Sequence, residues 1–178
     1  KRTPIWKLSS MATRFRSTLL VITLFVLIDW VTKLVVLLQY KDLQILTHPT
    51  LYTHSWGRFS FSIAPVFNEG AAFGLFSNYK YFLFLLRIFV ILGLLAYLFF
   101  KKKSIQSTTQ TALVLLCAGA IGNVGDIIFY GHIVDFISFN YKQWAFPTFN
   151  VADVLISLGT LLLVYKFYFP TKQTEKKR

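Results

Sequence analysis

Two pairs of asparagine and aspartate interrupt stretches of sequence that are otherwise apolar. Asn123 and Asp126 are three residues apart, and so are Asn150 and Asp153, so that in a helix each pair faces one side. A further carboxylate, Asp135, follows shortly after the first pair. A charged side chain costs at least about 2.5–3.5 kcal/mol at the centre of a membrane helix, so each of these groups needs a role.

Acid–base catalysis is one role for three carboxyl groups in one region. Two carboxylates a few ångströms apart cannot both ionise at low cost, so the pair shares one proton. A hydrolase would use the ionised member to take a proton from water and the protonated member to donate to a substrate carbonyl. A polar network between helices, an ion path in a transporter or channel, and a non-enzymatic scaffold are alternatives that the spacing leaves open.

The motifs of other common hydrolases are absent from the sequence. It contains no G-x-S-x-G and no H-E-x-x-H motif. His132 precedes Asp135 by three residues, which is a weak pattern for a metal ligand. The single cysteine, Cys117, has apolar neighbours that disfavour a thiolate, and one cysteine forms neither an intramolecular disulfide nor a cysteine zinc cluster. We expect no metal and no cofactor.

These polar residues require elements that hold them, and four apolar stretches are long enough to be membrane helices. The chain has 178 residues, of which 55% are apolar and 15% charged, against about 25% charged in an ordinary soluble domain. A bilayer core requires about 20 apolar residues as helix. The four stretches are residues 19–38, 81–100, 112–130 and 151–169. We predict an all-α membrane protein with four transmembrane helices in a single domain, residues 1–178.

The basic residues predict how these helices are oriented. Residues 1–16, the link 101–111 and the tail after residue 169 hold 12 of the 19 lysines and arginines. Cytoplasmic segments carry such an excess, so both termini are predicted to be cytoplasmic. The link 39–80 and the loop 131–150 are then predicted to lie on the outer, periplasmic side. The formal charge of +12 therefore indicates a membrane and not nucleic acid.

The outer link 39–80 is too long for a simple turn. Phe59, Phe61 and Ile63 alternate with serines, which predicts a short strand, and we expect Pro65 to end it. The link is therefore predicted to contain a small β element on the outer membrane surface.

Helix geometry predicts that the polar groups lie at one depth. At 1.5 Å per residue, Asp153 lies within about 5–8 Å of the outer boundary. Asp126 and Asp135 bracket the same boundary. An ion path would distribute carboxylates over the whole membrane depth, whereas only Asp29 is deep. Asp29 and Lys33 are four residues apart and can form an ion pair.

Four motifs together resemble the bacterial lipoprotein signal peptidases, or signal peptidase II, which are membrane aspartic proteases blocked by globomycin. The motifs are DWVTK (29–33), NEGAAFG (68–74), GNVGD with GHIVDF (122–126 and 131–136) and FNVAD (149–153). Each motif is weak by itself. All four in this order, on four predicted spans, are specific.

The resemblance implies an aspartic endopeptidase that removes the signal peptide of diacylglyceryl-modified prolipoproteins, just before the lipidated cysteine. Asp135 and Asp153 match the family's catalytic dyad. The matching substrate-binding or supporting positions are Asp29, Lys33, Asn68, Gly70, Asn123, Asp126 and Asn150. The implied location is the bacterial plasma (inner) membrane, with the active site at the outer leaflet. The implied partners are prolipoproteins, membrane lipid and globomycin-type inhibitors, and we expect a monomer.

The sequence departs from the family pattern at one position near the predicted site. The family usually has arginine directly after the aspartate of its G-N-x-x-D motif, whereas this chain has Ile127. Arg87, seven residues into the second span, is a further charge that either snorkels to the membrane surface or pairs with a carboxylate. Its position alone assigns it no chemistry.

Overall fold

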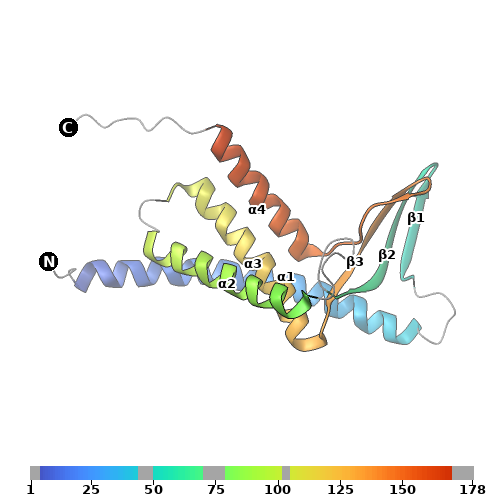
Figure 1. Cartoon of the computed structure of the whole chain (residues 1–178), viewed down its shortest axis with the longest axis horizontal. Coiled ribbons are helices and arrows are strands. Elements are labelled where there is room, and N and C mark those ends of the chain that lie inside the picture. The colour runs from blue at the N-terminus through green and yellow to red at the C-terminus, as the bar shows by residue number, and fades with distance from the viewer. Residues whose placement is uncertain (1–4, 44–49, 70–78, 102–104, 170–178) are drawn as a thin grey trace.

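The computed structural model describes residues 5–43, 50–69, 79–101 and 105–169, which form four helices and a four-stranded sheet (Figure 1). The helices are α1 (Ile5–Leu43), α2 (Lys80–Lys101), α3 (Ser107–Tyr130) and α4 (Val151–Tyr168). The strands are β1 (Tyr52–Trp56), β2 (Phe59–Asn68), β3 (Ile133–Tyr141) and β4 (Trp144–Ala145). All four described helices are long and apolar enough to cross a membrane, which confirms the predicted number of spans.

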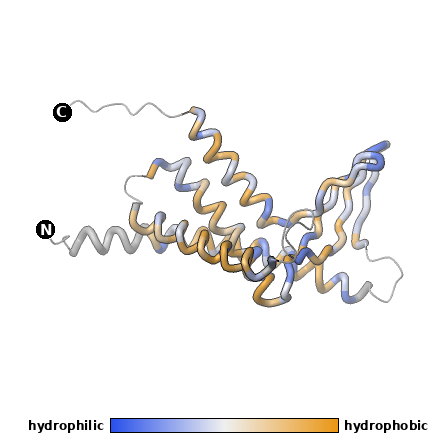
Figure 2. Tube along the Cα trace, viewed as in Figure 1, coloured by the Kyte–Doolittle hydropathy of each residue, from blue (hydrophilic) through white to orange (hydrophobic). Residues whose placement is uncertain are grey.

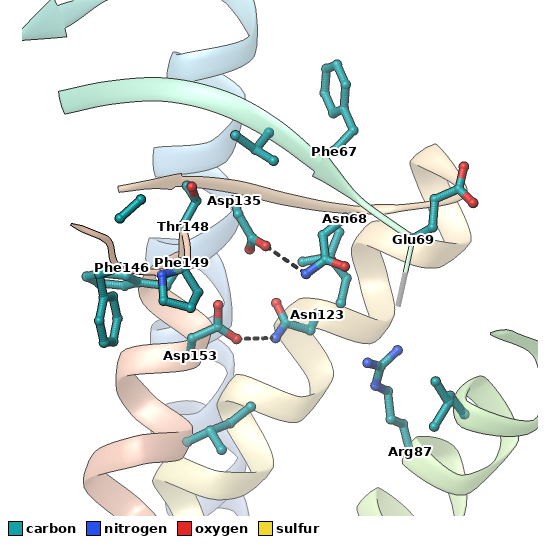
Figure 3. A pocket seen from close by; sticks show the side chains of 16 residues that line it. Phe67, Asn68, Glu69, Arg87, Asn123, Asp135, Phe146, Thr148, Phe149 and Asp153 are labelled. Carbon is teal, nitrogen blue, oxygen red and sulfur yellow. Dashed lines mark hydrogen bonds between the residues drawn. The ribbon is translucent and has the colours of Figure 1, made fainter. Parts of the chain in front are cut away.

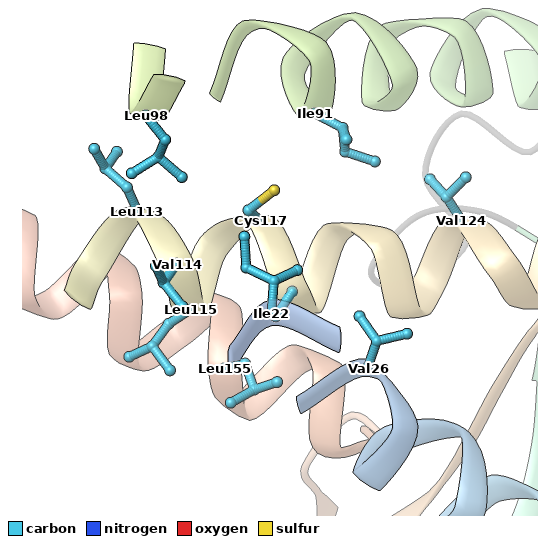
Figure 4. Close-up of a cluster of buried hydrophobic side chains, with 11 residues drawn as sticks. Ile22, Val26, Ile91, Leu98, Leu113, Val114, Leu115, Cys117, Val124 and Leu155 are labelled. Carbon is cyan, nitrogen blue, oxygen red and sulfur yellow. The ribbon is translucent and has the colours of Figure 1, made fainter. Parts of the chain in front are cut away.

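Helix α3 is the centre of the helical part and packs against α1, α2 and α4. Apolar side chains from all four helices meet around it, among them Ile22, Ile91, Cys117 and Leu155 (Figure 4). Large apolar residues also cover the outward sides of α1, α2 and α4, and the helices are apolar along most of their length (Figure 2). Such outward faces are suited to lipid contact, because water would oppose so large an exposed apolar surface.

Helices α3 and α4 approach each other closely because small residues lie between them. A Cβ atom added at Gly119 would collide with the backbone oxygen of Ala152 and would lie 2.7 Å from the Ile156 side chain. One added at Gly159 would lie 2.8 Å from the backbone oxygen of Ala112. Close packing of this pair fixes where the first turn of α4 lies relative to α3.

The sheet is antiparallel throughout, in the order β1-β2-β3-β4, and lies at one end of the helices (Figure 1). The prediction that Pro65 ends the second strand was wrong, because β2 continues to Asn68. The pairing of β2 with β3 shifts register between Ile63 and Val66. This irregularity accommodates a proline, which has no N–H for the ladder.

The segment 131–150, predicted as a loop, contains β3 and β4. Strand β3 pairs with β2 along most of its length, so the small β element is built from both outer segments and not from residues 39–80 alone. Its first residues, Ile133 to Phe136, are buried on both sides. A strand buried on both faces lacks the alternation of polar and apolar residues by which strands are recognised in a sequence.

One face of the sheet is almost entirely aromatic. The register brings the rings of neighbouring strands opposite each other, as with Phe59 and Tyr141, whose centroids are 4.5 Å apart. The ring-bearing residues on this face are Tyr52, His54, Trp56, Phe59, Phe61, Phe139, Tyr141 and Trp144. Asp135 and Phe139 are four residues apart in β3, so their side chains project from the same face of the sheet. The Asp135 carboxylate therefore lies on the aromatic face.

A buried ion cluster fastens α1 to α3 and α4. The Lys33 ammonium lies 2.7 Å from Asp29 Oδ2 and 2.7 Å from Asp126 Oδ2, and all three side chains are at most 1% exposed. It also donates to Asn123 Oδ1 at 3.2 Å. The second oxygen of Asp29 accepts from the backbone N–H of Ala152 in α4 at 2.8 Å. The predicted pairing of Asp29 with Lys33 is confirmed, and Asp126 joins it.

We predict that Gly119→Ala destabilises the protein by about 1–3 kcal/mol, because the new methyl group would overpack the contact between α3 and α4. Gly93→Ala is the matched control, since a Cβ atom at Gly93 would meet nothing within 4 Å. That change should stabilise α2 by about 0.5–1 kcal/mol through helix propensity. Unfolding in detergent micelles measures both, and equal effects would contradict the close packing.

We predict that Lys33→Met destabilises the protein by about 3–5 kcal/mol, because it leaves two buried carboxylates without their cation. Lys41→Met removes the same charge from an exposed position near the end of α1 and should change stability by less than about 1 kcal/mol. Chemical unfolding in mixed micelles compares the two variants. A similar small effect for both would show that the cluster does not hold the helices together.

Candidate active site

Asp135 projects from β3 into a set of amide donors. Its side chain is 3% exposed. Its Oδ1 accepts from Asn150 Nδ2 at 2.7 Å, and its Oδ2 accepts from Asn68 Nδ2 at 3.0 Å. These donors come from the start of α4 and the end of β2. The carboxylate is therefore positioned from both sides by neutral amide groups.

Asp153 lies in the first turn of α4, where the helix N-terminus favours a negative charge. Its Oδ1 accepts from Asn123 Nδ2 at 2.8 Å, and its Oδ2 accepts from the backbone N–H of Asn150 at 3.1 Å. In return, Asn150 Oδ1 accepts from the backbone N–H of Asp153 at 2.9 Å. This reciprocal pair is a capping box, so the same contacts that begin the helix also fix the Asp153 carboxylate.

Asn150 joins the two aspartates. Its side-chain oxygen caps α4, while its Nδ2 donates to Asp135 and to Asn123 Oδ1, the latter at 3.1 Å. The residue is fully buried. The backbone of the preceding Phe149 pairs with Ile137 in β3, and this bridge brings the start of α4 beside β3.

Both aspartates line one cavity of about 810 Å³ at the junction of the sheet and the helices. Figure 3 shows the two carboxylates facing the same space, with Asn68 and Asn123 holding one each. The other side is formed by Phe146, Pro147, Thr148 and Phe149, and the Phe149 ring stacks on Phe139 of the aromatic face at 6.1 Å. The cavity therefore continues the aromatic face of the sheet.

The environment of Asp135 makes its carboxyl group easier to protonate than an ordinary aspartate. Burial raises the pKa of its carboxyl from the ordinary 3.8 to about 6. The hydrogen bond from Asn68 opposes this rise, whereas the negative charge of Asp153 adds to it. A carboxyl group with this pKa can hold and release a proton near neutral pH.

The structure brings most of the predicted site residues together in one network. Asn68, Asn123 and both aspartates line the cavity, and Asn150 lies directly behind them. The supporting residues Asp29, Lys33 and Asp126 lie one layer deeper, in the ion cluster. Asp126 Oδ2 also accepts from the backbone N–H of Val134 at 3.1 Å, which ties that layer to the start of β3. Gly70 lies outside the described residues.

His132 and Arg87 are two residues near the site to which the sequence assigned no definite role. The His132 ring lies against Phe67 and Tyr130, with centroids 4.5 and 6.3 Å away. In the described part of the chain, no group of three or more His, Cys, Asp or Glu residues is arranged to hold a metal ion. Arg87, to which the sequence assigned no chemistry, lines the cavity that contains both aspartates. The signal that could have found it was its charge inside an apolar span.

Comparison with known proteins gives close relatives. A family model described as signal peptidase (SPase) II matches residues 21–169. A lipoprotein signal peptidase of Chlamydia felis is 64% identical over 166 residues, covering 93% of this chain and 100% of the relative. One of Chlamydia trachomatis serovar D is 53% identical over 166 residues, covering 93% of this chain and 99% of the relative.

Two solved structures, each described as a bacterial membrane enzyme, have a similar fold. One has a TM-score of 0.67 at 28% identity and covers 91% of this chain and 93% of its own. The other has a TM-score of 0.66 at 30% identity and covers 87% and 94%. The family match, the relatives and the four apolar helices agree, and the chain is a bacterial multi-pass membrane protein that belongs to the signal peptidase II family of peptidases.

Proposed function

We propose that this protein is an aspartic endopeptidase that cleaves the signal peptide from diacylglyceryl-modified prolipoproteins, just before the lipidated cysteine. The lipoprotein signal peptidases to which the chain is similar support the substrate class. The observation that carries the catalytic assignment is that Asp135 and Asp153 open onto one cavity, each held by its own amide donors. An ion path requires polar groups that continue through the molecule, whereas these converge on a single cavity.

In the proposed reaction, Asp135 holds the shared proton and Asp153 is ionised. Asp153 takes a proton from a water molecule as the water oxygen bonds to the scissile carbonyl carbon, and Asp135 donates its proton to the carbonyl oxygen. In the resulting tetrahedral intermediate, Asp153 passes its proton to the departing nitrogen and the C–N bond breaks. Asp135 recovers a proton from the intermediate's hydroxyl group, which regenerates the starting pair. The raised pKa of Asp135 supports this division of roles.

We propose that the sheet lies on the outer surface of the bacterial plasma membrane and that the site lies at the outer leaflet. The beginning of α1 and the end of α4 lie at the end of the helices away from the sheet (Figure 1). In the sequence, the segments that adjoin these helix ends carry most of the basic residues, which favours a cytoplasmic location for both termini. Exposed rings such as Trp56, Phe59 and Trp144 suit the membrane–water interface.

The aromatic face gives an extended substrate a surface leading to the aspartates. A substrate anchored by acyl chains in the outer leaflet would meet these rings first and the cavity next. Because one chain supplies both aspartates and all of the described lining, we expect it to act as a monomer.

We predict that Asp135→Asn and Asp153→Asn each reduce cleavage of a lipidated prolipoprotein by several orders of magnitude, since general acid–base groups contribute about 10²–10⁴ each. Asparagine preserves the shape but cannot exchange a proton. The measurement is turnover by purified protein, with globomycin as the inhibitor control. Both variants should unfold in one cooperative transition, and substantial turnover by either folded variant would exclude the dyad.

We predict that kcat/KM falls as the pH rises through about 6, because Asp135 then loses the proton that it must donate. Asn68→Ala removes a donor that favours the ionised form, so it should move this decline to higher pH. The measurement is the pH profile of kcat/KM for both proteins. A shift to lower pH in the variant would contradict the assignment of the proton to Asp135.

A further inference from the structure

Helices α1 and α3 form a separate cavity of about 340 Å³ near the start of α3. Its lining residues come from these two helices, and none of them lines the larger cavity that contains both aspartates. In Figure 1 the first turns of α3 lie at the end of the helices away from the sheet. The proposed hydrolysis therefore does not account for this cavity.

The cavity changes from polar to apolar along its length. Hydroxyl and amide side chains line the end near the start of α3, among them Ser17, Ser107 and Gln110. Val21, Phe25 and Leu115 line the part nearer the middle of the helices. Eight residues of each helix, at 1.5 Å per residue, give the cavity a length of about 12 Å. A polar end that continues into an apolar groove matches a lipid, which joins a polar headgroup to apolar acyl chains.

A hydrogen bond between the two helices orients the polar end. Gln110 Nε2 donates to Thr18 Oγ1 at 3.3 Å, and Thr18 is only 4% exposed. The amide of Gln110 carries a second N–H, and Ser107 brings a hydroxyl group to the same end of the cavity. Donors of these kinds form strong hydrogen bonds to the charged oxygens of a phosphate group.

The charges at this end favour an anionic ligand. Arg16, an exposed residue of α1, directly precedes Ser17 in the lining. In the sequence, residues 1–28 contain five lysines or arginines, residues 101–125 contain three, and neither stretch contains Asp or Glu. Basic residues beside transmembrane helices attract acidic lipids. They would repel the basic beginning of a signal peptide, so the substrate is not a suitable occupant.

We propose that this cavity binds one anionic phospholipid, with its phosphodiester group at Ser107 and Gln110 and an acyl chain along Val21 and Phe25. In the orientation proposed above, the ligand is a lipid of the cytoplasmic leaflet. The bound lipid contacts both α1 and α3, and it thereby stabilises the packing of the two helices that carry the ion cluster. The binding itself requires neither the aspartates nor the cleavage reaction.

The primary experiment measures lipid binding to the purified full chain by native mass spectrometry. The protein is titrated with phosphatidylglycerol or with phosphatidylcholine that has the same acyl chains. We expect one molecule of phosphatidylglycerol to bind about tenfold more tightly than phosphatidylcholine, because only the former has a net negative charge. Equal affinity for the two lipids would show that the groove accepts acyl chains of any lipid, and it would overturn the assignment of an anionic ligand.

Two substitutions of Gln110 test the position of the phosphate. Gln110→Glu keeps the size of the side chain but replaces its N–H donors by a negative charge, so it should weaken phosphatidylglycerol binding about 10- to 100-fold. Gln110→Lys should instead tighten this binding about 2- to 5-fold. Opposite effects of the two charges cannot arise from a loss of folding. Unchanged affinity in both variants, or a change in the same direction, would contradict a phosphate at Gln110.

Two tryptophan substitutions on α1 test the apolar part of the cavity. Val21 lines the cavity, whereas the adjacent Leu20 does not line it and is 70% exposed. Val21→Trp should fill the groove and weaken phosphatidylglycerol binding about tenfold, and Leu20→Trp should change it by less than about twofold. Equal losses in the two variants would place the lipid elsewhere on α1 and overturn the proposal.

Arg58→Gln is the control for overall charge. Arg58 lies in the exposed turn between β1 and β2, at the other end of the protein (Figure 1). Its substitution should change phosphatidylglycerol affinity by less than about twofold, because salt screens charges at such a separation. A loss as large as that of Gln110→Glu would show that net charge and not the cavity attracts the lipid. These affinities are measured without substrate, so failure of the proposed peptidase activity would leave them unaltered.

Discussion

The buried ammonium of Lys33 is the interaction on which the rest of the site depends. It lies within 2.7 Å of carboxylates on its own helix and on α3. Each of those carboxylates also accepts a hydrogen bond from a backbone N–H. The donor to Asp29 lies at the start of α4, and the donor to Asp126 lies at the start of β3. One cation thus fixes the two elements that carry the catalytic candidates. In an apolar surrounding such a cluster is strong only because every partner is present, since an unpaired buried charge costs several kcal/mol.

The layer above the ion cluster is built from amides, which suit the proposed proton transfers. Asn123 accepts from Lys33 and donates to Asp153, so it transmits the position of the ion cluster to the cavity without adding charge. Asn150 is likewise a neutral group that donates a hydrogen bond to Asp135. A lysine at either position would bind a carboxylate more strongly and would hold it ionised at all useful pH values. Neutral donors orient both aspartates and leave one of them able to hold a proton.

The four helices could be predicted from the sequence, because apolar stretches are a local signal. The costly charges likewise marked Asp135 and Asp153, which the structure places at one cavity. The sheet could be predicted only in part. Strand β3 carries apolar residues on both faces where it enters the protein, and its pairing with β2 depends on residues about 70 positions away. The position of Arg87 depends on how α2 packs against α3, which no spacing within one helix reveals. Long-range contacts are therefore what the sequence alone could not provide.

The two aspartates of the larger cavity have different surroundings, in line with the different roles proposed for them. Asp153 lies at a helix N-terminus, with Arg87 across the cavity. Asp135 lies on a strand, is almost completely buried and, within the described residues, accepts hydrogen bonds from two neutral amides. The first environment compensates a negative charge, and the second does not. Two chemically identical side chains are thereby made unequal by the elements that carry them, and an unequal pair is what general acid–base hydrolysis of a peptide bond requires.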